Sequence, residues 1–187
     1  MKALKLISIA FISFLLTDIL DAQEYDFSTE RLNGLEVRKF YTEEQFIEAF
    51  GEPDYISSAI HDYFVYERVI TSPSPAAVED IVGGVAAEKI TDGIGFISNQ
   101  DGEYRIEVYT IHSDQIVFND YIRVGDHVSK VFDMGGTTLE CKNEDGSGYI
   151  YWVPEGGPEE PYIEWNCFPA FYYDKNGIIE MIQSYND

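Results

Sequence analysis

The side chains that could carry out chemistry are few and scattered along the chain. His61, His112 and His127 are its three histidines, and no pair of them combines with acidic residues at the spacing of a zinc site. Ser147 lies in Asp-Gly-Ser-Gly-Tyr, outside the Gly-x-Ser-x-Gly frame of a hydrolase nucleophile. The glycine pair 135–136 follows a predicted helix, whereas a phosphate-binding loop precedes one. The sequence therefore predicts no catalytic residue, no metal site and no cofactor.

Carboxylates are abundant, with 34 Asp and Glu residues against 12 Lys and Arg residues. Some pair of them will lie at the separation that glycoside hydrolysis needs, but a real site also requires one carboxyl of raised pKa in an apolar pocket. Asn143, Asp145 and Ser147 alternate as in part of a calcium loop, yet position twelve is Pro154 instead of the bidentate Glu. We interpret this segment as a solvated hairpin turn.

Aromatic side chains in the last third of the chain are the positive signal for function. Strand alternation places Tyr149 and Tyr151 on one face of the predicted strand 148–153, and Ile150 and Trp152 on the other. One face must pack on a helix, and exposed Tyr and Trp on the other would mark an interface. The alternative is a tyrosine-rich solvated sheet. The predicted partner-binding residues are Tyr149, Tyr151, Trp152, Trp165, Tyr172 and Tyr173.

Cys141 and Cys167 are the two cysteines of the chain. In an oxidising compartment a single disulfide between them is possible, and two unbonded thiols are the alternative. Both interpretations stay open, because a disulfide requires the two Cα atoms to lie within about 7 Å of each other.

A short, well-delimited helix is predicted in residues 41–54, upstream of these aromatic residues. Thr42 and Gln45 fit a capping box, in which each side chain accepts from the other residue's backbone N–H group. Gly51 ends the helix and Pro53 prevents it from resuming. A weaker copy is predicted from Asp126, as the cap, to the glycine pair 135–136.

The strands predicted after the first helix resemble those predicted after the second. Aromatic strands are predicted at 62–70 and 148–153, and each is followed by a proline-rich connection. Hairpins with Asp-Gly or Asn-Gly turns are predicted within 96–107 and 171–182. The order helix, strand, loop, hairpin therefore occurs twice, which indicates a tandem repeat.

We expect two α+β units, each with a short helix or helix pair packed on an antiparallel β-sheet. The first unit covers residues 23–119 and the second covers 120–187. Residues 115–122 are predicted to form a strand that crosses between the units, and 74–91 a broken helix or a loop.

This pattern resembles the group that contains the β-lactamase inhibitory proteins and the BamE (SmpA/OmlA) outer-membrane assembly lipoproteins. The residues that carry the resemblance are Thr42, Gln45, Phe50, Gly51 and Pro53, with weaker counterparts at Asp126, Val131 and Gly135. The resemblance implies two tandem units whose sheets form one concave protein-binding face over residues 41–185. The chain departs from the group because no lipid-anchoring Cys lies near its predicted cleavage point and the second copy lacks Gly-x-Pro.

The first 22 residues have the features of a secretory signal peptide. Lys2 and Lys5 precede an apolar run, 6–16, that is too short to span a bilayer, and Ala22 offers a cleavage point. We therefore expect an exported protein, periplasmic or extracellular, that does not span a membrane. Its net charge of −22 argues against nucleic acid or anionic lipid as a partner. That charge favours solubility outside the cytoplasm, and it leaves open a partner with a basic surface.

Together these features favour an exported, non-enzymatic binding module that recognises a protein partner through an aromatic, acidic sheet face. The alternative is a carbohydrate-active or other hydrolytic enzyme that uses a carboxylate pair. A third hypothesis is a structural envelope component that associates with itself.

Overall fold

The computed structural model describes residues 29–58, 62–70, 88–155 and 168–184. The predicted signal peptide, most of the helix-or-loop segment 74–91, Trp165 and Cys167 lie outside these residues. The predictions made for them therefore stay predictions.

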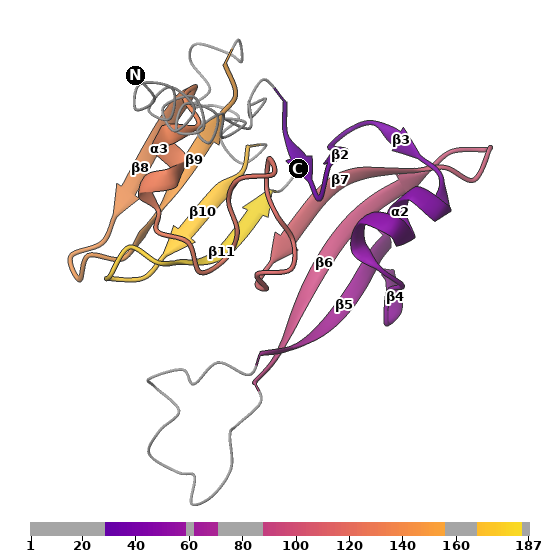
Figure 1. Ribbon diagram of the computed structural model, residues 1–187, viewed down its shortest axis with the longest axis horizontal. Helices are drawn as coiled ribbons and strands as arrows, with labels where there is room; N and C mark the ends of the chain where they lie inside the picture. The colour runs from indigo at the N-terminus through magenta and orange to yellow at the C-terminus, as the bar shows by residue number, and fades with distance from the viewer. Residues whose placement is uncertain (1–28, 59–61, 71–87, 156–167, 185–187) are drawn as a thin grey trace, which may run out of the picture.

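The described residues form one large antiparallel sheet with short helices on one side of it (Figure 1). Its strands run in the order β4-β5-β6-β7-β11-β10-β9-β8, and β3 pairs with the start of β7. The strands are β3 (Phe40–Tyr41), β4 (Tyr55–Ser58), β5 (Asp62–Ile70), β6 (Glu88–Ser98), β7 (Tyr104–Ile111), β8 (Thr137–Lys142), β9 (Gly148–Val153), β10 (Ala170–Tyr173) and β11 (Ile179–Ser184). A separate two-stranded hairpin consists of β1 (Arg31–Leu32) and β2 (Leu35–Glu36).

The sheet consists of two successive four-stranded meanders, β4–β7 and β8–β11, that meet where β7 pairs with β11. The helix α2 (Glu43–Phe50) precedes the first meander and α3 (Ser129–Asp133) precedes the second. Buried side chains from both meanders belong to one hydrophobic cluster, which includes Phe64 of β5 and Trp152 of β9. The two meanders therefore share a core.

The predicted α+β fold class is wrong. The fold is dominated by the antiparallel sheet, with 50% of the structure in strands and 11% in the two described helices. The second helix is shorter than predicted because Asp126 does not cap it. The Asp126 Oδ2 atom instead accepts the backbone N–H of Arg123, at 3.0 Å, which closes a turn. The N-cap of α3 is Val128, which has no capping side-chain bond, and the helix has only five residues.

The first helix begins and ends as predicted. Thr42 and Gln45 form the complete capping box at the start of α2, and Gly51 ends the helix with a φ of 82°. Phe46 and Phe50 are the buried residues of α2. They lie with ring centroids 5.7 Å from Phe64 and 6.2 Å from Tyr66, respectively. This small aromatic layer fixes α2 on the first meander.

The structure confirms the strands predicted at 62–70 and 148–153 and the two predicted hairpins. The prediction of a strand at 115–122 is wrong. Asn119 and Asp120 have positive φ values of 48° and 56°, so the chain turns there. Phe118, at this turn, inserts edge-on between Trp152 and Phe171, with centroid distances of 5.6 and 5.1 Å. Burial of Phe118 in the shared core therefore outweighs the strand pattern.

The sheet has a helix face and a far face, which is turned away from the viewer in Figure 1. Residues paired across strands share a face. The helix face runs from Phe64 through Ile94, Tyr109 and Ile182 to Trp152. The far face carries the alternate residues, and its strand β6 presents Gly93 and Gly95.

Gly95 is required by a close approach on the far face. A Cβ atom there would lie 2.3 Å from Cγ2 of Val108 and 2.9 Å from the ring of Tyr63. At Gly93 the nearest atom would be a carbon of Tyr63 at 3.7 Å, an ordinary contact. The Tyr63 ring therefore packs over the strand because these two positions lack side chains.

We expect Gly95→Ala to lower the free energy of unfolding by about 1–3 kcal/mol, because a β-branched side chain on the neighbouring strand cannot move away cheaply. Gly93→Ala is the matched control, and it should change stability by less than about 1 kcal/mol. Urea denaturation followed by circular dichroism measures both values. Equal losses for the two variants would contradict the packing described for Tyr63.

The residues before β1 are fixed to the sheet by a carboxyl–phenol contact. The hydroxyl of Tyr109, on β7, donates to Oε1 of Glu30 at 2.5 Å. Burial raises the pKa of Glu30 to about 7, although the Tyr109 hydrogen bond and the charge of Arg38 act in the opposite direction. Burial and the neighbouring Glu30 also raise the pKa of Tyr109. The phenol therefore stays protonated and serves as the donor.

The pKa of Glu30 predicts a pH dependence of stability. Between its ordinary value of 4.5 and about 7, the folded chain binds the proton more tightly than the unfolded chain. The contribution of Glu30 to the free energy of unfolding therefore falls as pH rises through this window. Between pH 4.5 and 7 we expect the free energy of unfolding of Glu30→Gln to rise relative to that of wild type, by at most about 3 kcal/mol. Paired denaturation curves across this range measure the difference, and a difference independent of pH would refute the prediction.

Candidate functional site

Three of the predicted binding residues come together on the far face of the second meander. Tyr149 and Tyr151 lie on β9, and Tyr172 lies directly opposite Tyr149 on β10. The ring of Tyr149 is 5.4 Å from that of Tyr151, edge to face, and 5.3 Å from that of Tyr172. All three side chains are half-buried. We call these three residues the tyrosine cluster.

Mostly uncharged side chains surround the tyrosine cluster. On the edge strand β8, Leu139 lies opposite Tyr151 and Cys141 lies opposite Tyr149. Leu139 is 39% exposed, unusually high for a leucine in a strand. On the other side, Met181 of β11 lies opposite Tyr172. The far-face residues paired across β8–β11 include no charged side chain, and Glu180 lies in the bulge of β11, outside these pairs.

Two tyrosines of this cluster, Tyr149 and Tyr151, act as neutral phenols. A hydrogen bond with Cys141, followed by desolvation, raises the pKa of Tyr149 to about 12. Burial, and then the neighbouring Cys141, raise the pKa of Tyr151. At physiological pH each hydroxyl can therefore donate and accept hydrogen bonds but cannot serve as a general base. This chemistry suits recognition better than catalysis.

Trp152 and Tyr173, also predicted to bind a partner, lie in the core on the helix face. Trp152 is completely buried, and its indole Nε1–H donates to the carbonyl of Gly135 at 2.8 Å. Tyr173 is buried, with its hydroxyl donating to Oε1 of Glu140 at 2.7 Å. Burial leaves neither side chain a surface for a partner. Trp165 lies outside the described residues.

One of the two cysteines that could form a disulfide lies in the described part of the chain. Cys141 is a free cysteine in the structure. It lies on the far face of β8, beside Tyr149. The structure of Cys167 is not described, so the choice between a disulfide and two unbonded thiols stays open.

The far face also brings two tyrosines of the first meander into the same surface, and the sequence analysis did not identify them. Tyr63 of β5 lies over Gly93 and Gly95, as described above. Tyr55 of the edge strand β4 lies opposite Val65, on the same face, and is 49% exposed. Alternation along 62–70 could have placed Tyr63 with Val65, but the pairing with β4 and β6 is not encoded locally.

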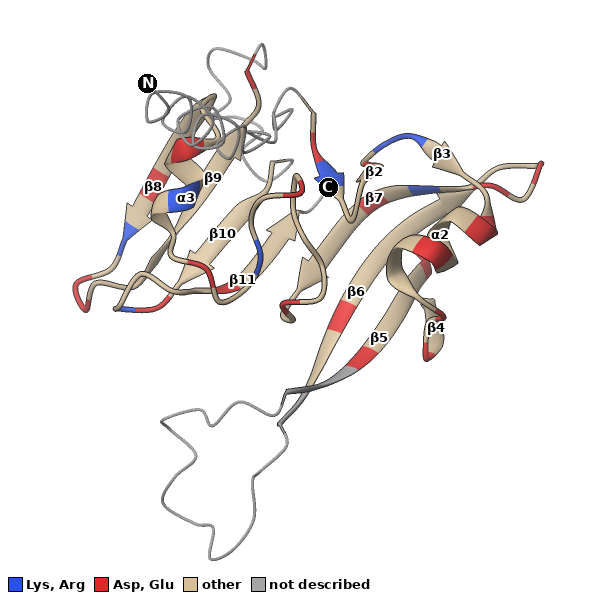
Figure 2. Ribbon diagram, in the orientation of Figure 1, with Lys and Arg blue, Asp and Glu red and all other residues tan. Residues whose placement is uncertain are grey.

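The acidic residues are distributed differently from the aromatic ones. Figure 2 shows many of them on α2 and in the turns at the ends of strands, including Glu144 and Asp145 between β8 and β9. Asp174 lies in the turn between β10 and β11. The sequence analysis expected one sheet face that is both aromatic and acidic. In the second meander these acidic residues lie instead in the turns that join the strands, at the border of the aromatic face.

Polar groups with catalytic potential do not assemble into a reactive site in the described residues. Buried Asp92 accepts the Ser113 hydroxyl at 2.5 Å and the backbone N–H groups of His112 and Ser113, at 2.7 and 3.0 Å. Because Ser113 is itself buried, this cluster fixes the end of β7 instead of presenting a nucleophile. In the same described part of the chain, no group of three or more His, Cys, Asp and Glu side chains could hold a metal ion.

The described residues do not unite the features of a carboxylate-pair enzyme. A cavity beside α2 is lined by Glu43 and Glu52. Among the carboxyls of the described residues, the one with the strongly raised pKa is Glu30, which does not line that cavity and is hydrogen-bonded to Tyr109.

Comparisons with known proteins show no family for this chain. No protein-family model matches the sequence. No curated protein matches it either. Among solved structures, the chain is similar to an extracellular protein containing a SCP domain from Bacillus anthracis str. Ames, with 11% sequence identity and a TM-score of 0.41. The match covers 80% of this chain and 44% of that one.

Within the described residues, neither helix has the length and apolar character that a membrane crossing requires.

The two faces of β9 predict unequal effects of substitution on stability. Trp152→Ala should lower the free energy of unfolding by about 3–5 kcal/mol, because it empties a buried site and leaves the Gly135 carbonyl without its donor. Tyr151→Ala, one residue away, should cost about 1 kcal/mol or less. Chemical denaturation of the two variants tests this, and similar losses would contradict the assignment of the two faces.

Proposed function

We propose that this chain is an exported, non-enzymatic binding module and that the tyrosine cluster on the far face contacts a protein partner. The observation that carries the proposal is the division of the aromatic residues. Trp152 and Tyr173 are buried in the core, whereas Tyr149, Tyr151 and Tyr172 stay partly exposed and adjacent. A fold that only needed aromatic packing would not have to keep these three side chains at the surface.

The composition of the surface supports a protein as the partner. Tyrosine buries a large area at a low cost in conformational entropy, and its hydroxyl can satisfy polar groups of the other chain. The exposed Leu139 and the half-buried Met181 extend the apolar area around the tyrosine cluster. A central uncharged patch with charged residues at its border is the usual composition of a protein–protein interface.

The charge of the chain supports a basic surface on that partner. With a net charge of −22 and acidic turns at the ends of β8–β11, the module would attract a basic protein before the tyrosines make contact. We expect such steering to affect the association rate more than the lifetime of the complex.

The first step of the test is to capture proteins from the exported fraction of the source organism with the immobilised chain. Each captured protein is then purified, and its dissociation constant is measured with wild type and with the double variant Tyr149→Ala/Tyr151→Ala. We expect the double variant to bind at least tenfold more weakly, since truncation of a hot-spot tyrosine at the centre of an interface costs about 2 kcal/mol or more.

Phe132→Ala is the matched control, because Phe132 is an aromatic residue that is 49% exposed but lies on α3, outside the far face. It should change the dissociation constant less than twofold. The proposal is overturned if every captured protein binds the double variant as tightly as wild type. A captured polysaccharide that depends on the same tyrosines would instead favour a carbohydrate-binding role.

A further inference from the structure

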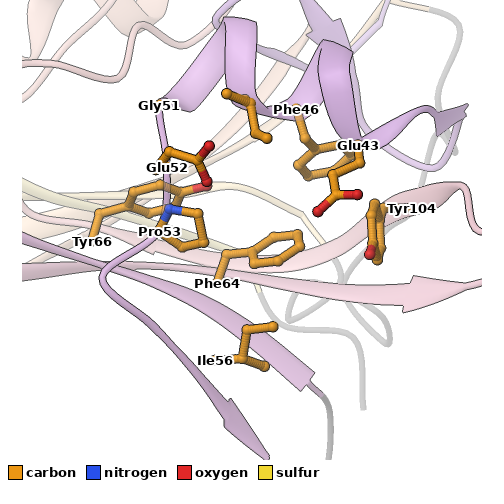
Figure 3. A pocket seen from close by; sticks show the side chains of 10 residues that line it. Glu43, Phe46, Gly51, Glu52, Pro53, Ile56, Phe64, Tyr66 and Tyr104 are labelled. Carbon is orange, nitrogen blue, oxygen red and sulfur yellow. The ribbon is translucent and has the colours of Figure 1, made fainter.

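A second surface lies at the opposite end of the sheet, where the helix α2 covers the edge of the first meander. A cavity of about 90 Å³ opens there between α2 and the strands β4 and β5 (Figure 3). Its lining is partly aromatic and includes Phe46 of α2 and, on the strands, Phe64 and Tyr104. A single buried water needs roughly 10–15 Å³, so the space suits a side chain of about six to nine non-hydrogen atoms. An arginine side chain, with seven non-hydrogen atoms, falls in this range, and a lysine side chain, with five, is slightly smaller and also fits.

The charges of this cavity are all of one sign. Glu43, in the first turn of α2, and Glu52, just after its end, both line the cavity, and Figure 3 shows their carboxylates extending toward the strands. No Lys or Arg is among the lining residues. Within the described residues, neither carboxylate takes part in an ion pair. A cation over aromatic rings and between carboxylates would be stabilised by both.

The strand beside the cavity has an open edge. β4 pairs with β5 on one side, and in the described part of the chain no strand pairs with its other side. Two neighbouring residues of β4 are large, apolar and exposed, Tyr55 at 49% and Ile56 at 57%. Ile56 lies on the helix face opposite Phe64 and lines the cavity. Exposed apolar edge strands are uncommon in isolated proteins because they invite pairing with another chain.

We propose that the open edge of β4 and the adjoining cavity bind an extended basic segment of a partner protein. This segment would add to the sheet as a strand beside β4 and place one Arg or Lys side chain in the cavity between Glu43 and Glu52. Main-chain hydrogen bonds would supply the register, and the cavity would select the basic residue. The site is separate from the tyrosine cluster and does not depend on the function proposed for it.

Charge argues for another protein, and against a second copy of this chain, as the occupant. Residues 42–54 contain five acidic residues and no basic one, and the whole chain carries −22. Two copies meeting at β4 would bring these segments together and repel each other. A basic strand would neutralise them.

The test uses the full chain and a defined probe, a fluorescein-labelled decapeptide in which Arg and Val alternate, at 150 mM salt. Fluorescence anisotropy gives its dissociation constant for wild type, for Glu43→Gln/Glu52→Gln and for Glu44→Gln/Glu48→Gln. The second pair lies on α2, is exposed, removes the same charge and does not line the cavity. We expect the first pair to weaken binding at least tenfold and the second pair less than twofold.

Three further measurements isolate the site. A peptide with citrulline in place of Arg keeps the shape and loses the charge, and it should bind at least tenfold more weakly than the Arg peptide. Amide NMR shifts on addition of the Arg peptide should change in β4 and not at the tyrosine cluster. Tyr149→Ala/Tyr151→Ala should bind this peptide as wild type does, which separates this proposal from the preceding one.

Several results would overturn the inference. Equal weakening by the two glutamate pairs would show general attraction to an acidic chain. Undiminished binding of the citrulline peptide, or no measurable binding of the Arg peptide, would exclude the cation site. A dimer in sedimentation experiments that Ile56→Lys abolishes would show that a second copy covers β4.

Discussion

The pairing of β7 with β11 is the contact on which the rest of the structure depends. Only three residue pairs form it, Ile111 with Ile182, Thr110 with Gln183 and Tyr109 with Ser184. On the helix face it buries Ile111 and Ile182 completely, and on the far face the Gln183 side chain donates to the Thr110 hydroxyl at 3.1 Å. Without this pairing, the two meanders would be separate small sheets with two additional open edges.

The segment between the meanders is part of the core and does not act as a linker. Phe118 packs against Trp152 and Phe171, while Asp92 fixes the start of the segment through Ser113. Asn33, in the turn between β1 and β2, holds the middle of the segment through two hydrogen bonds with Val117. The Asn33 backbone N–H donates to the Val117 carbonyl at 2.9 Å, and the Asn33 Oδ1 atom accepts the Val117 backbone N–H at 2.7 Å. The hairpin β1–β2 therefore holds the connection in place, and the two meanders behave as parts of one core.

This architecture separates charge from aromatic surface. The large negative charge lies chiefly on α2 and in the turns, where it is solvated, and the far face of β8–β11 is left to tyrosines and apolar residues. The two proposed binding surfaces lie toward opposite ends of the strand order, near β9 and at β4 (Figure 1). They can therefore be occupied independently, one through uncharged aromatic contact and the other through charge.

Local sequence determined the elements whose signals are contained within a few residues. The capping box of Thr42 and Gln45, the hairpins at Gly102 and Gly177, and the alternation that separates Tyr151 from Trp152 all follow from neighbouring residues. Tertiary structure decided what depends on distant partners. It buried Phe118 where a strand was predicted, shortened α3 and placed Tyr63 over Gly95. These outcomes are set by packing and register between segments far apart in the chain, and a sequence pattern does not specify that register.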